Sequence, residues 1–139
     1  MSGIVVDTSV VLKWYIPEQD HEAARRLRDD YLERSFDLIA PALMPFEALN
    51  ALKYSGHYDG ARLEEAARSL SEYGIDLVPF EKIEGIAKIA TDLDVTVYDA
   101  AYVALARQFD TTAYTADENL LEDLDNGYRQ FGEHIRTYP

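Results

Sequence analysis

The 139-residue chain contains no cysteine. Without cysteine the protein has no disulfide framework, no thiolate nucleophile and no zinc site built on cysteine ligands. Long hydrophobic runs are also missing, and none approaches the ~18 residues of a membrane span. The chain opens MSGIVVD, where no basic stretch precedes the short apolar run and an acid ends it. We therefore expect no signal peptide, and a soluble, cytoplasmic protein.

Positive charge is scarce as well. Thirteen Lys and Arg residues face 26 Asp and Glu residues, which gives a formal net charge of −13. Lysine supplies only four of the 13 cations. A surface of this sign repels polyanions, so nucleic-acid binding through a broad basic patch is disfavoured.

Strand signals alternate with helix signals along the whole chain. Short β-branched or apolar runs predict strands at residues 3–7, 37–40, 75–78 and 111–114, and residues 134–137 are a candidate edge strand. Helical spacing with proline and glycine signals predicts helices over residues 8–14, 17–31, 45–56, 63–73, 79–93, 97–109 and 117–124. This alternation predicts an α/β fold: a three-layer α/β/α single domain over residues 1–139, with a mostly parallel sheet of four to five strands.

Four acids fall where a parallel sheet places its functional sites. Asp7 ends the first strand, Glu47 lies in the first turns after the second, and Asp117 follows the fourth. Asp99 is the one acid in the Ala-rich segment at residues 97–109. Because the carboxyl ends of parallel strands meet at one edge, we expect these four carboxyl groups to lie within roughly 4–8 Å of a common point, the spacing that bridging metal ions require.

Each acid also has a simpler interpretation. Asp7 and Asp99 are candidate helix caps, Asp117 is an acid in an early helical turn, and Glu47 is a candidate solvated side chain. Taken together, however, two carboxylates ~5 Å apart repel by roughly 3 kcal/mol at an effective dielectric near 20. A cluster of four therefore requires either raised pKa values or a bound cation.

An all-oxygen ligand set favours Mg²⁺, with Mn²⁺ as a substitute, over zinc. The three histidines, at positions 21, 57 and 134, show no ligand spacing and are predicted to be surface or loop residues away from this edge. Carboxylates that hold a divalent metal suit phosphodiester hydrolysis, because the metal activates water and neutralises charge on the phosphate.

Four segments resemble the motifs of PIN-domain ribonucleases, in the same order. They are VVDTSVVLKW at residues 5–14, PFEALN at 45–50, YDAAYVALA at 98–106 and YTADENL at 114–120. Each motif alone is weakly specific, but the ordered set covers nearly the whole chain. The length is most similar to that of the VapC toxin branch of toxin–antitoxin modules.

This resemblance implies a Mg²⁺-dependent endoribonuclease that forms a homodimer, cuts RNA and is inhibited by a cognate antitoxin in its active-site groove. The acids that match the motifs are Asp7, Glu47, Asp99 and Asp117.

Four further residues are candidates for supporting roles. Ser9 and Thr115 place hydroxyls near the expected metal, and Asn50 lies one helical turn from Glu47. Lys13 is a candidate contact for a substrate phosphate. The simpler roles are helix capping for the two hydroxyls and solvated side chains for Asn50 and Lys13.

Other functions remain open at this point. A phosphatase of the haloacid-dehalogenase type needs a second Asp where Ser9 stands, and a receiver domain needs an Asp after the third strand, where the chain reads VPF. Both are disfavoured. An RNA-processing nuclease of the PIN fold and a non-catalytic interaction domain of the same fold are the remaining alternatives.

Overall fold

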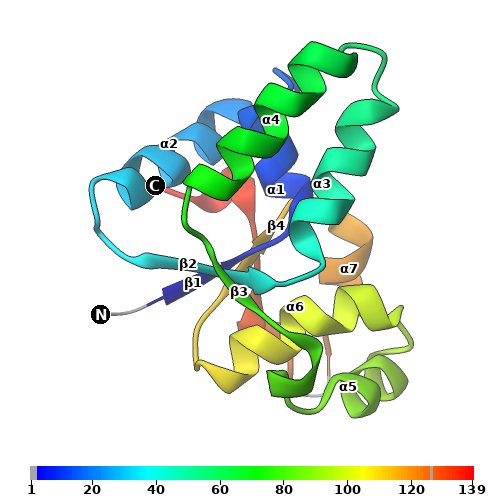
Figure 1. Ribbon diagram of the computed structural model, residues 1–139. Coiled ribbons are helices and arrows are strands. Elements are labelled where there is room, and N and C mark those ends of the chain that lie inside the picture. Colours follow the sequence, from blue (N-terminus) through cyan, green and yellow to red (C-terminus); the bar gives the residue numbers. More distant parts are fainter. Residues whose placement is uncertain (1–2, 126) are drawn as a thin grey trace.

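The computed structural model describes residues 3–125 and 127–139, and these form a five-stranded sheet with helices on both faces (Figure 1). The strand order is β3-β2-β1-β4-β5, and every neighbouring pair is parallel. Helices α1 to α4 lie on one side of the sheet, and α5 and α6 lie on the other. The predicted three-layer α/β fold is confirmed.

The bounds of the elements are as follows. The strands are β1 (Gly3–Val6), β2 (Asp37–Pro41), β3 (Asp76–Val78), β4 (Ala113–Thr115) and β5 (Gly132–His134). The α-helices are α1 (Thr8–Val11), α2 (His21–Leu32), α3 (Met44–Lys53), α4 (Gly60–Glu72), α5 (Ile86–Leu93), α6 (Val97–Gln108) and α7 (Glu118–Asp123). Short 3-10 helices are η1 (Leu12–Trp14), η2 (Phe80–Lys82), η3 (Arg129–Phe131) and η4 (Ile135–Thr137).

Several predicted boundaries were wrong. The helix expected from Pro17 begins at His21, because Asp20 before it has a left-handed φ of 65° and cannot belong to a right-handed helix. The helix expected after Pro79 is interrupted at Gly85, whose φ of 78° is left-handed, and α5 starts after it.

The fifth strand was also misplaced. It covers Gly132–His134, and residues 135–137, which were expected to be extended, form η4 instead. The His134 ring accepts a hydrogen bond from the backbone N–H of Arg136 at 3.0 Å. This cap turns the chain out of the strand direction directly after His134.

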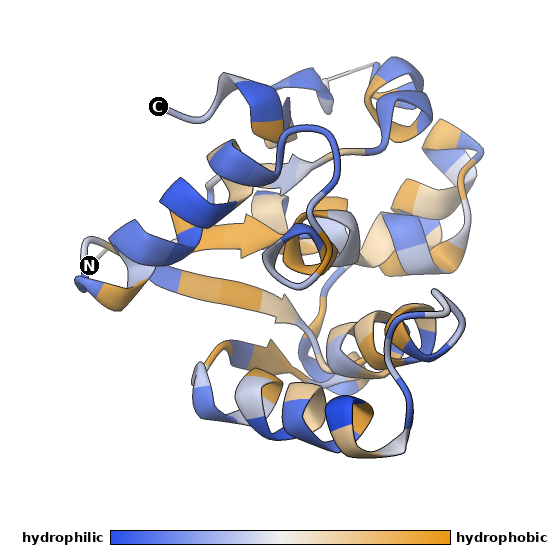
Figure 2. Cartoon of the chain, turned by 90° about the horizontal axis from the view of Figure 1, so that it is seen from above, coloured by the Kyte–Doolittle hydropathy of each residue, from blue (hydrophilic) through white to orange (hydrophobic). Residues whose placement is uncertain are grey.

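Helix α6 is buried on nearly all sides because it belongs to two cores. Tyr102, Leu105 and Ala106 pack in the large core around the sheet, while Ala100, Val103 and their neighbours pack in a second core with α5 and α7. Figure 2 shows the corresponding hydropathy: the central strands are hydrophobic along most of their length, whereas the helices are striped. Among the described residues, no helix combines the length and the apolar character needed to cross a bilayer.

Because α6 is buried in two cores, we can predict how substitutions in it change the stability of the protein. Leu105→Ala removes a fully buried side chain, so we expect it to lower the free energy of unfolding by about 2–5 kcal/mol. Val97→Ala, at an exposed position of the same helix, should change it by less than about 0.5 kcal/mol. Urea denaturation measures both values, and similar losses for the two variants would contradict this packing.

Candidate active site

Asp7 lies directly after β1 and is buried, with 8% of its surface exposed. Its Oδ2 accepts hydrogen bonds from the hydroxyls of Ser9 at 2.6 Å and Thr115 at 2.8 Å. Burial raises the pKa of Asp7, and the nearby charge of Glu47 adds to this effect, while the two hydroxyls oppose it. Although Asp7 occupies the position before α1, its side chain makes no capping hydrogen bond. The cap interpretation of Asp7 was therefore wrong.

Glu47 lies in the first turn of α3 and is held from two other elements. Its Oε1 accepts hydrogen bonds from the Thr8 hydroxyl and from the Tyr102 hydroxyl, each at 2.9 Å, and these two hydroxyls are 2.7 Å apart. Burial, followed by the charge of Asp7, raises the pKa of Tyr102, so its phenol stays protonated as a donor. Glu47 is thus a fixed, half-buried carboxylate rather than a solvated one.

Asp99 lies in the first turn of α6, but it is not the cap of that helix. The cap is Thr96, whose hydroxyl accepts the backbone N–H of Asp99 at 3.1 Å. Burial raises the pKa of Asp99, followed by repulsion from Asp7, Asp117 and Glu47 in that order. The carboxylate of Asp99 is therefore electrostatically coupled to the other three acids.

Asp117 connects the end of β4 to α7. Its Oδ1 caps α7 by accepting the backbone N–H of Leu120 at 3.2 Å, and its own N–H donates to the Thr115 hydroxyl at 3.0 Å. The helix-terminus role considered for Asp117 is thus present in the structure. The cap uses one carboxyl oxygen and leaves the other for further contacts.

The four carboxylates, which we call the acidic edge, offer only oxygen donors, as hard divalent cations require. Within residues 3–125 and 127–139, no ion pair neutralises any of them. In the same residues, no three acidic or histidine side chains stand close enough together to hold a metal ion. The donor chemistry and the raised pKa values of Asp7 and Asp99 fit a divalent cation, whereas the expected convergence of the four carboxyl groups on one point is not preformed.

Supporting residues fall into two groups. Ser9 and Thr115 lie at the acidic edge, 3.3 Å apart, and Ser9 also accepts the backbone N–H of Ala116 at 2.9 Å. Lys13 does not join them: it is buried, and its ammonium donates to Glu18 at 3.2 Å and to the Gln19 carbonyl. Asn50 is exposed on α3. No hydrogen bond from its side chain to a carboxylate is among those formed by the described residues, so its supporting role stays a prediction.

His134 corrects the prediction that the histidines are surface residues away from this edge. It is buried, and it pairs with Thr115 in the register of β5 with β4. Its ring is already engaged, because Nδ1 accepts the Arg136 N–H and Nε2 lies 4.0 Å from Glu118. Burial, followed by the charge of Arg136, lowers the pKa of His134.

Sequence reasoning missed Thr8 and Tyr102, the two residues that hold Glu47. Thr8 directly follows Asp7 in the first motif. Tyr102 lies one turn after Asp99 and carries the only hydroxyl in the apolar segment at residues 99–106. A lone polar group on a buried helix needs a hydrogen-bond partner, so the Tyr102 hydroxyl could have been recognised from the sequence as a group with a specific contact.

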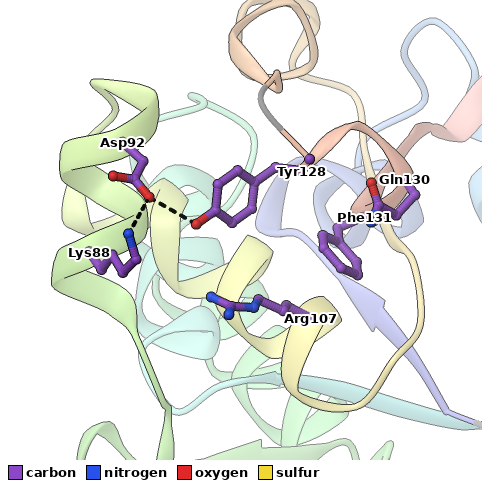
Figure 3. Close-up of a pocket in the computed structure, with 7 residues that line it drawn as sticks. Lys88, Asp92, Arg107, Tyr128, Gln130 and Phe131 are labelled. Carbon is purple, nitrogen blue, oxygen red and sulfur yellow. Dashed lines mark hydrogen bonds and ion pairs between the residues drawn. The ribbon is translucent and has the colours of Figure 1, made fainter.

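A cavity of about 600 Å³ lies elsewhere, between α5, the end of α6 and the segment around η3 (Figure 3). Asp92 accepts hydrogen bonds there from Lys88 and from the Tyr128 hydroxyl, each at 3.0 Å. None of the four acids lines this cavity. Its contacts tie the segment before β5 to α5.

Comparisons with known proteins agree with this geometry. The family model of the PIN domain matches residues 4–126. The chain is 31% identical over 126 residues to a protein named Ribonuclease VapC3 from Pyrobaculum aerophilum, a match that covers 86% of this chain and 92% of the relative. The structure defines the class as an α/β protein with a parallel sheet and an acidic edge. The chain belongs to the PIN-domain family.

Solved structures share the fold at lower identity. PAE2754 from Pyrobaculum aerophilum superposes with a TM-score of 0.71 at 20% identity, covering 98% of this chain and 85% of that one. FitAcB from Neisseria gonorrhoeae superposes with a TM-score of 0.60 at 18% identity, covering 86% and 91%.

The raised pKa of Asp7 makes a prediction about pH. Because the folded pKa exceeds the unfolded value of about 3.9, the folded state binds this proton more tightly. In EDTA, wild type should therefore lose stability relative to Asp7→Asn as the pH rises from about 4 to 7. At pH 7 the thermal midpoint of Asp7→Asn should equal or exceed that of wild type, as measured by circular dichroism. A substantially lower midpoint would mean that the charged carboxylate stabilises the fold.

Proposed function

We propose that this protein is a Mg²⁺-dependent endoribonuclease that hydrolyses RNA phosphodiester bonds at the acidic edge. The observation that carries the proposal is the placement of four carboxylates after parallel strands or at helix starts, where hydroxyls hold Asp7 and Glu47 and no ion pair among the described residues neutralises any of the four. Membership of the PIN-domain family and the similarity to a protein named as a ribonuclease support it.

In this proposal Asp7, Glu47, Asp99 and Asp117 hold the metal. When bound, Mg²⁺ supplies charge neutralisation at the scissile phosphate and a lowered pKa for the attacking water. Mn²⁺ suits the same oxygen ligands.

The chain's own contribution is to orient these ligands with neutral hydroxyls. Ser9 and Thr115 both donate to Oδ2 of Asp7, which fixes the carboxylate plane without neutralising its charge. Thr8 and Tyr102 do the same for Oε1 of Glu47. A lysine or arginine in any of these places would compete with the metal for the carboxylates, whereas hydroxyl donors keep the net charge available for a cation.

We further propose that the protein acts in the cytoplasm as the toxin of a toxin–antitoxin pair and forms a homodimer. The VapC3 relative, which this chain matches over most of both lengths, supports this assignment over an RNA-processing role. A cognate antitoxin is expected to bring an arginine to the acidic edge, because a guanidinium bridges two carboxylates with paired hydrogen bonds.

Metal dependence is the first test. We expect the purified protein to cleave RNA with Mg²⁺ or Mn²⁺, to be inactive in EDTA, and to bind without cleaving in Ca²⁺. Asp99→Asn removes a ligand charge but keeps the shape of the side chain, so cleavage should fall at least a hundredfold while the thermal midpoint in EDTA stays near that of wild type. Gel analysis of structured and unstructured RNA measures cleavage.

Asp123→Asn, at an exposed acid on α7, is the matched control and should retain full activity. Cleavage that persists in EDTA, or that is equal in the Asp99→Asn preparation, would refute the metallonuclease and favour a non-catalytic interaction domain. Metal-dependent cleavage combined with harmless expression in cells would instead favour RNA processing over a toxin.

A further inference from the structure

The outward side of α3 carries an exposed row of aromatic and polar residues that begins beside Glu47. Phe46, Asn50 and Tyr54 are four residues apart, so they follow one another along one face. Phe46 is 75% exposed and Tyr54 is 74% exposed. Lys53 is also exposed, with its ammonium 5.2 Å from the centroid of the Tyr54 ring. We call these four residues the α3 stripe.

The stripe leads away from the acidic edge. Helix α3 rises from the edge of the sheet and projects outward beside α4 (Figure 1). Tyr54 lies eight positions after Phe46, which corresponds to about 12 Å along the helix axis. Within Met44–Lys53, all of which the structure describes, Glu47 is the only acid and Lys53 the only cation. A polyanion that follows α3 away from the acids therefore meets no further negative charge on this helix.

Phe46 also borders an apolar groove between α3, α4 and β3, with Leu49, Leu70 and Leu77 among its lining residues. The rest of the stripe does not belong to this groove, because Asn50, Lys53 and Tyr54 are absent from its lining. Aromatic rings interleaved with an amide and an ammonium are unlike an aliphatic docking surface. They are typical of proteins that bind single-stranded nucleic acid by stacking bases and contacting phosphates.

We propose that unpaired RNA next to the cleaved bond lies along the α3 stripe, with bases stacked on Phe46 and Tyr54 and a phosphate near Lys53. This inference rests on the proposed nuclease function and assigns the residues outside the acidic edge that contact the RNA. It also explains how a chain of net charge −13 retains RNA, because stacking supplies affinity without a basic patch.

The probe is a set of short unpaired RNA oligonucleotides, each with one 2-aminopurine, whose fluorescence is quenched when the base stacks on a ring. Binding is measured in Ca²⁺, so that the RNA stays intact. Wild type should quench the probe, and an excess of unlabelled single strand, but not of the same RNA as a preformed duplex, should reverse the quenching. Phe46→Ala and Tyr54→Ala should each weaken binding by about tenfold or more and remove quenching at one position.

Matched variants separate stacking from other effects. Phe46→Tyr and Tyr54→Phe keep the rings and should retain quenching. Phe109→Ala removes a 45% exposed ring that directly follows the C-terminal end of α6, whereas Asp99 lies at the N-terminal end. This variant should bind the RNA like wild type. Lys53→Gln should reduce the slope of log affinity against log salt by about 0.7, the value for one phosphate contact on a single strand.

Absence of quenching by wild type, or equal quenching by Phe46→Ala, Tyr54→Ala and wild type, would overturn the proposal. The proposal would also be overturned if Phe46→Ala changed the molecular mass of the protein in solution but left RNA binding unchanged, since Phe46 would then lie between protein copies. Cleavage of the same RNA in Mg²⁺ is measured in parallel. If wild type quenches the probe but does not cleave the RNA, the α3 stripe is supported and the nuclease is refuted. If wild type cleaves the RNA but Phe46→Ala and Tyr54→Ala quench the probe as wild type does, the α3 stripe alone is refuted.

Discussion

The parallel pairing of β1 with both β2 and β4 is the constraint on which the rest of the molecule depends. All five strands point the same way, so the segments that leave them start from one edge of the sheet. Asp7 follows β1 and Asp117 follows β4, its immediate neighbour in the sheet. If one of these strands were antiparallel, its acid would lie at the opposite edge, and Thr115 would not reach Asp7.

Neutral hydroxyls, rather than cations, organise this edge. Thr115 donates to Asp7 and accepts the N–H of Asp117, so one side chain ties the ends of two strands together. Tyr102 brings α6 to Glu47 on α3, across the layers of the fold. These contacts fix the orientation of the carboxylates but add no positive charge. Burial first, and repulsion from the neighbouring acids after it, raises the pKa values of Asp7 and Asp99. A site of this kind leaves its negative charge available for an external cation.

The sequence was sufficient to predict the α/β class, because that class follows from the alternation of strand and helix signals. Asp7, Glu47, Asp99 and Asp117 were chosen by their places after strands or at helix starts, but the expected meeting of their carboxyl groups at one point is not formed among the described residues, and their role as metal ligands stays a prediction. The end of β5 was misplaced because the cap made by the His134 ring depends on tertiary burial. Lys13 was misassigned to the site region for a similar reason: its partners, Glu18 and Gln19, become acceptors only once the loop before α2 is folded.

The membership of α6 in two cores has a consequence for local motion. Most helices of a small protein can open toward solvent on one side, and their amides then exchange without global unfolding. Residues 100–106 of α6 have no such side, since every one of them is buried against the sheet or against α5 and α7. Asp99 lies in the more exposed first turn of the same helix and directly precedes this stretch. The backbone that carries its carboxylate is therefore attached to the part of the chain that opens last.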